Sequence, residues 1–113
     1  MVSNNPDALE QLFHEIAAEL QQLASLFLLL EQNWTEGDKY ELAYLDTPKQ
    51  VVTHILNTIH HFSSKGEFTP QAAQNIQQIV ASFVRNFDNP FFETQYRNQI
   101  NHIVSALSSL SRR

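Results

Sequence analysis

The fold is decided by residues 5–32, NPDALEQLFHEIAAELQQLASLFLLLEQ. Apolar residues recur in this segment at alternating intervals of three and four, which is the pattern of a helix that packs one face against its neighbours. These positions are Leu9, Phe13, Ile16, Leu20, Leu23, Phe27 and Leu30. Asn5 can cap the first turn, and Pro6 suits the first helical position because its missing N–H needs no partner there. The segment therefore predicts a helix over residues 6–32.

Three further pairs of residues mark helix starts in the same way. They are Thr47-Pro48, Thr69-Pro70 and Asn89-Pro90. In each pair we expect the Thr or Asn to be the N-cap, because its side-chain oxygen can accept from a free backbone N–H. Gln50 extends the first pair into a capping box. Each start is followed by apolar residues at helical spacing. The predicted helices cover residues 48–63, 70–87 and 90–111.

The connections restrict how these helices pack. Links of about three to seven residues join the last three predicted helices, and links that short favour antiparallel neighbours. Gly66 can end the second helix in a left-handed cap. The link 34–46 is longer and can cross an end of the bundle or lie along its side. We predict an all-α fold, an antiparallel four-helix bundle, with residues 1–113 as a single domain. A longer first helix against a three-helix remainder is the alternative.

The charge of the chain excludes one class of partner and suggests how the first helix packs. Seven Lys and Arg against twelve Asp and Glu give a formal net charge of −5. We expect no nucleic-acid partner, because binding a phosphate backbone depends on positive charge. Residues 1–46 carry nine acids and one base, whereas residues 47–113 carry three acids and six bases. This asymmetry predicts that the first helix meets opposite charge, either within a monomer or across a symmetric dimer.

The sequence lacks the signatures of cysteine-based sites, of a membrane-spanning helix and of a signal peptide. The chain contains no Cys, which excludes disulfides and thiolate metal sites. Its most apolar run, residues 23–30, is much shorter than a bilayer-spanning helix. Residues 1–11 have neither the basic region nor the apolar region of a signal peptide. We therefore expect no membrane partner and a cytoplasmic location.

The histidines do not converge on a metal site. His54 and His61 would lie about 10.5 Å apart along a helix, and His60 points away from its neighbour His61. Glu10 and His14 have helical spacing but lie off the apolar stripe. The chain also lacks a Gly-rich phosphate loop, a nucleophile elbow and any carboxylate on a predicted core stripe. We expect no metal, no cofactor and no catalytic residue.

An uncharged polar surface is the first feature that favours protein binding. Charged residues make up 17 % of the chain, against about 25 % in an average protein, whereas Gln and Asn number 11 and 9. Residues 71–84 contain no ionisable side chain. Amide faces lose water more readily than charged faces, and interfaces are depleted of charge at their centres. The candidate interface residues on the outer side of this helix are Gln74, Gln77 and Gln78. The alternative is a solvent-facing surface that happens to use amides.

The apolar end of the first helix is the second such feature. In residues 23–30, LASLFLLL, apolar side chains point around nearly the whole circumference, and Leu28 and Leu29 lie opposite the core-facing stripe. A helix that is apolar all round must be covered all round. Either the link 34–46 folds back over it, or a second subunit covers it. The predicted interface residues here are Leu26, Leu28, Leu29 and Trp34.

The Asn-Pro and Thr-Pro helix starts, together with the Gln-rich segment 71–78, resemble small orphan helical proteins of filamentous cyanobacteria. The resemblance implies a lineage-restricted protein and assigns no catalytic or binding residue. From the surface features we expect a non-catalytic interaction or regulatory module that binds a protein partner or itself, as a homo-oligomer. The alternative is a helical domain that binds an apolar ligand or cofactor between its helices, under the 34–46 link.

Overall fold

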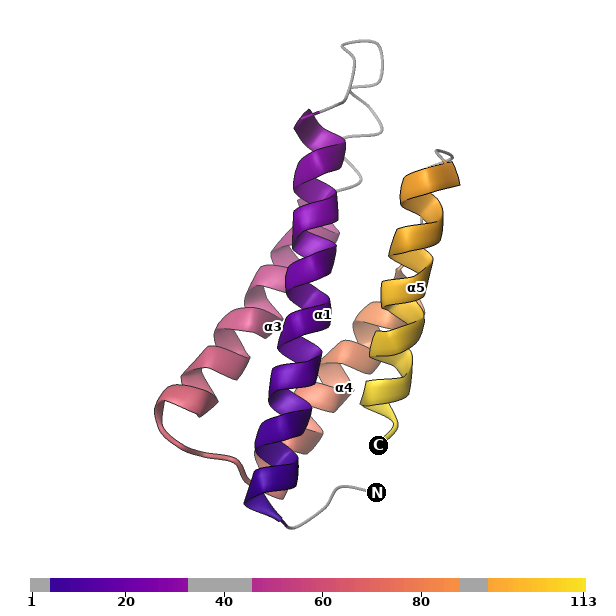
Figure 1. Cartoon of the computed structure of the whole chain (residues 1–113). Helices are drawn as coiled ribbons and strands as arrows, with labels where there is room; N and C mark the ends of the chain where they lie inside the picture. The colour runs from indigo at the N-terminus through magenta and orange to yellow at the C-terminus, as the bar shows by residue number, and fades with distance from the viewer. Residues whose placement is uncertain (1–4, 33–45, 88–93) are drawn as a thin grey trace.

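The computed structural model describes residues 5–32, 46–87 and 94–113. It contains an all-α bundle of four described helices, as the sequence predicts (Figure 1). The helices are α1 (Pro6–Gln32), α3 (Asp46–Ser64), α4 (Pro70–Asn86) and α5 (Thr94–Ser111). The predicted ranges agree closely for α1, for α4 and for the carboxyl end of α5.

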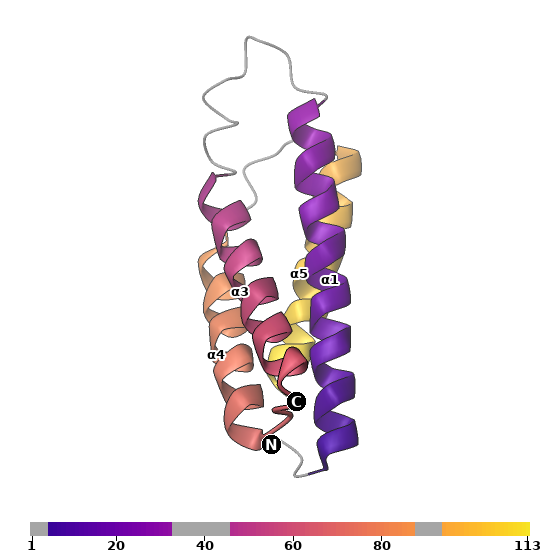
Figure 2. The same ribbon diagram turned by 90° about the vertical axis from the view of Figure 1, so that its left-hand side faces the viewer.

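Each helix runs antiparallel to its neighbours, and the start of α1 and the end of α5 lie at the same end of the bundle (Figures 1 and 2). Helices α3 and α5 both pack against α1 and against α4, so α1 and α4 lie diagonally across the bundle. Although α1 is the longest helix, it takes one corner like the others. The antiparallel four-helix arrangement is therefore confirmed.

The core is formed by the apolar stripes of the four helices. All seven stripe positions of α1 are buried, and Leu12 and Leu26 are buried beside them. Phe13 is fully buried, and its ring lies 5.6 Å from that of Phe68 and 6.3 Å from that of Phe62. Such aromatic contacts add to the energy of apolar burial. The phenyl cluster therefore ties the amino-terminal half of α1 to the connection between α3 and α4.

Two helix starts follow the predicted capping chemistry. Thr69 has extended backbone angles, and its Oγ1 accepts a hydrogen bond from the N–H of Ala72 at 3.1 Å, with Pro70 next to it at the start of α4. Asn5 Oδ1 accepts from the N–H of Asp7 at 3.0 Å. Both side chains satisfy a donor that the helix itself leaves free.

The end of α3 is a Schellman motif centred on Gly66. The N–H of Glu67 donates to the carbonyl of Phe62 at 2.9 Å, and the N–H of Gly66 donates to that of Ser63 at 3.1 Å. Gly66 has a φ of +67°, the left-handed conformation that this motif requires and that a Cβ disfavours. The predicted glycine cap is confirmed.

The predicted cap at Thr47 is wrong, because α3 begins at Asp46 and Thr47 lies in its first turn. Proline fits any first-turn position, since those N–H groups have no partner within the helix. Pro48 therefore indicates that a helix starts within a few residues but does not identify the first residue of the helix. The predicted start at Asn89-Pro90 falls outside the described residues, and α5 is described from Thr94. Trp34 and most of the link 34–46 also fall outside them.

The acidic α1 meets basic residues within the monomer. Glu31 accepts a hydrogen bond from Lys49 of α3, and Glu15 accepts one from Arg113 beyond the end of α5. Arg112 Nε donates to the carbonyl of Ser108 at 3.2 Å, which caps the last turn of α5. The charge asymmetry left open whether these contacts form within a monomer or across a dimer. Both of these pairs form within the monomer. Ion pairs that remain in contact with solvent, as both of these do, contribute little to stability.

Candidate interaction surface

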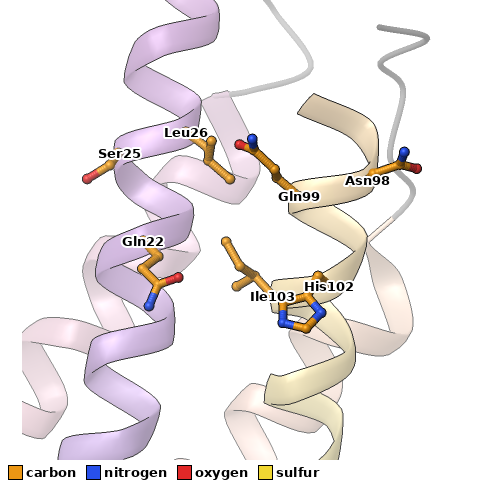
Figure 3. A pocket seen from close by; sticks show the side chains of 7 residues that line it. All are labelled: Gln22, Ser25, Leu26, Asn98, Gln99, His102 and Ile103. Carbon is orange, nitrogen blue, oxygen red and sulfur yellow. The ribbon is translucent and has the colours of Figure 1, made fainter. Parts of the chain in front are cut away.

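A groove of about 530 Å³ runs between α1 and α5. Figure 3 shows Leu26 and Ile103 reaching from the two helices toward the space between them, while Ser25 and Asn98 point away at its margins. The lining residues are Gln22, Ser25, Leu26, Asn98, Gln99, His102 and Ile103. The groove is an open depression in the surface, with side chains from only two helices.

The chemistry of this groove combines an apolar floor with an amide rim. Leu26 and Ile103 form the floor and are only 9 % and 3 % exposed. Gln22, Asn98 and Gln99 on the rim are exposed amides. None of the seven lining residues is Asp, Glu, Lys or Arg. Such a surface can be desolvated without burying an unpaired formal charge.

Leu28 and Leu29 at the end of α1 are exposed to 54 % and 43 %. Packing among the four helices therefore does not cover them, and cover by the link 34–46 falls outside the described residues. Leu29 follows Leu26 by three positions and lies on the side of α1 that faces the groove. Leu28 precedes Glu31 by three and lies on the flank toward α3, to which Glu31 is bonded. The two leucines thus extend different faces of α1.

The candidate glutamines of α4 divide into two kinds. Gln74 and Gln78 are exposed, as expected. The expectation that Gln77 lies on the outer side is wrong: it is 6 % exposed, and its Nε2 donates to the carbonyl of Leu110 at 3.0 Å. Its spacing from Ala73 and Val80 is that of the apolar stripe, so the sequence contained the signal. Gln77 joins α4 to the end of α5 and is not available to a partner.

The predicted interface residue Leu26 is also buried, yet it forms the groove floor and keeps one edge exposed to the groove. Of the residues named for the interface, Leu28, Leu29, Gln74 and Gln78 are exposed in the described chain. The sequence did not identify the α5 side of the groove. Asn98, Gln99 and His102 belong to a stretch with few charges, which was visible, but their position beside α1 depends on the packing of helices distant in sequence.

A second groove, of about 400 Å³, lies between α1 and α3. Phe13 and Ile59 contribute to its floor, and His14 and His60 lie on its rim. His14 Nε2 is 3.8 Å from a carboxylate oxygen of Glu10. All five histidines are exposed. Within residues 5–32, 46–87 and 94–113, no three His, Asp or Glu side chains are grouped as metal ligands would be.

Comparison with known proteins adds no indication of function. The chain matches no family model, no curated protein and no solved structure. In the described part of the chain, no helix has the length and apolar character needed to cross a membrane.

Proposed function

We propose that this chain is a non-catalytic protein-interaction module that self-associates. The observation that carries the proposal is the exposure of Leu28 and Leu29, which are the large apolar side chains left exposed among the described residues. The other large apolar side chains on α1 are buried in the core, so this end of the helix is exceptional. Adjacent exposed leucines favour contact with another protein surface.

The low charge of the neighbouring surface supports the same proposal. The α1–α5 groove begins one helical turn before Leu29, and its lining residues carry no acid and no strong base. Burying a charge without a partner is costly, whereas an amide needs only a hydrogen bond. A partner that covers Leu29 can therefore continue over the groove at modest cost.

The alternative, an apolar ligand held between the helices, has the size of the groove in its favour, since ligand pockets commonly measure about 300–1,000 Å³. Its shape favours a protein partner instead. The floor offers one edge each of Leu26 and Ile103, whereas a ligand site encloses most of its ligand in apolar walls. The side chains at the centre of the bundle, Phe13, Leu20 and Ile76 among them, are fully buried by their neighbours.

The test is the molar mass in solution, measured by light scattering over a concentration series. We expect the mass to rise from 13.0 kDa toward twice that value as the concentration increases. Leu29→Glu should weaken this rise because it places a carboxylate on the apolar face. Circular dichroism and a melting curve check that the variant folds, which we expect because Leu29 is substantially exposed. A mass of one chain at every concentration would overturn the proposal.

A further inference from the structure

We infer that a second copy of the chain docks across the α1–α5 groove, with the two-fold axis running along the groove. The inference rests on the proposed self-association and specifies its surface and symmetry. In this arrangement α1 of each copy lies over α5 of the other and runs antiparallel to it. Because this axis keeps each residue at its own height along the groove, Gln99 of one copy lies over the α1 segment around Leu26 of the other, and Gln22 lies over the α5 segment around Ile103 (Figure 3). Gln22 and Gln99 of opposite copies are thus about one helical turn apart.

Charge complementarity selects this axis. Helix α1 contains five acids and no base, whereas residues 94–113 contain three arginines and no acid. An axis along the groove places the acidic α1 of one copy over Arg97 of α5 and the carboxyl-terminal arginines of the other, which is attractive and adds to the Glu15–Arg113 pair within each chain. A two-fold axis across the helices would instead place α1 over α1, with acid against acid. The first arrangement lets two chains of net charge −5 approach each other.

The amide rim explains why the occupant is a second copy. Each Gln or Asn side chain carries two N–H donors and an acceptor oxygen, so an amide surface can hydrogen-bond to another copy of itself. A two-fold interface needs this self-complementarity, because each contact occurs twice with the roles exchanged. The α1–α3 groove is less suited, since His14 with Glu10 beside it and His60 bring three ionisable groups to its rim, whereas the lining residues of the α1–α5 groove include one, His102.

The area of this surface indicates a weak dimer. Helix α5 has 18 residues and is about 27 Å long, and a helix with its side chains is about 10 Å wide. Two adjacent helices thus present a face of about 540 Å², near the lower limit for specific association, where about 800 Å² per partner is standard. We expect a dissociation constant in the micromolar range, so that dimerisation depends visibly on concentration.

Charge-swap variants of the full chain test the arrangement. One chain carries Gln22→Lys with Gln99→Lys, and the other carries Gln22→Glu with Gln99→Glu. Each variant alone should associate at least about tenfold more weakly than the original chain, because four like charges meet across the axis. An equimolar mixture should recover dimers, because the lysines of one chain then lie within about one helical turn of the glutamates of the other, where opposite charges attract. Sedimentation velocity measures all three samples, and melting curves confirm that each variant folds.

The matched control is Gln74→Glu with Gln78→Glu, which places the same charges on exposed amides of α4, diagonally across from α1. We expect it to dimerise like the original chain. If the control breaks the dimer and the groove variants do not, the groove is overturned and self-association stands. If the groove variants break the dimer but their mixture does not recover it, the two-fold placement is overturned. If the original chain is monomeric throughout, the proposed function itself fails.

Discussion

Replacing Gln77 with methionine should destabilise the bundle although methionine has nearly the same volume. Gln77 Nε2 donates to the carbonyl of Leu110 at 3.0 Å, inside the contact between α4 and α5. This carbonyl lies in the last turn of α5 and has no later N–H within the helix to accept from. Methionine fills the same space but cannot donate. The variant therefore isolates the hydrogen bond from the packing of the side chain.

The magnitude follows from what the carbonyl loses. A buried acceptor deprived of its partner costs about 1–3 kcal/mol. The N–H of Arg113 also points at this oxygen, at 3.4 Å, and retains a weak bond in the variant. We therefore expect a loss of about 1–2 kcal/mol in the free energy of unfolding, which corresponds to a decrease of about 4–10 °C in melting temperature for a domain of this size.

Urea unfolding of Gln77→Met and of Gln78→Met measures this effect, at a concentration where the chain is monomeric. Gln78 is the next residue of α4 and is exposed, so Gln78→Met should change stability by less than about 0.5 kcal/mol. Helix propensity is the same in both variants and cancels in the comparison. Equal midpoints and slopes for the two variants would refute the assignment of a stabilising role to the Gln77 hydrogen bond.

Three further outcomes are expected. Thr69→Ala should lower the free energy of unfolding by about 1 kcal/mol, measured in urea, because it removes the acceptor for the N–H of Ala72; an unchanged midpoint would contradict this. Gly66→Ala should cost about 1 kcal/mol through the positive φ alone, since a Cβ there meets no atom within 4 Å, and thermal unfolding at or above the original temperature would show that the turn can relax. EDTA should leave the melting temperature unchanged, because metal-ligand groupings are lacking in the described helices; a large decrease would reveal a structural metal.

The sequence predicted the helices well because their determinants are local. Apolar spacing located the buried face of each helix, and Thr69 and Gly66 marked ends whose hydrogen bonds close within a few residues. Thr47 misled the prediction for the same reason. A proline start signal constrains a whole turn, so the helix can begin earlier, at Asp46.

The candidate surface was predicted only in part, because it depends on contacts between distant segments. Leu28 and Leu29 were identified from the periodicity of one helix. The groove could not be identified from the sequence, since Leu26 and Ile103 are brought together only when α5 packs on α1. Gln77 was assigned to the surface because a polar residue is expected there, yet the carbonyl of Leu110, 33 residues away, gives it a buried partner.

The pairing of α1 with α5 has a consequence for the order of folding. Glu15 and Arg113, which connect the two, are 98 residues apart, whereas α3 with α4 and α4 with α5 are neighbours along the chain. Closing a long loop costs more entropy than closing a short one, so local hairpins form more readily than this pair. We expect the α1–α5 groove to form late in folding, so that a partly folded chain lacks the surface through which the proposed dimer forms. Association through the groove would then select for fully folded chains.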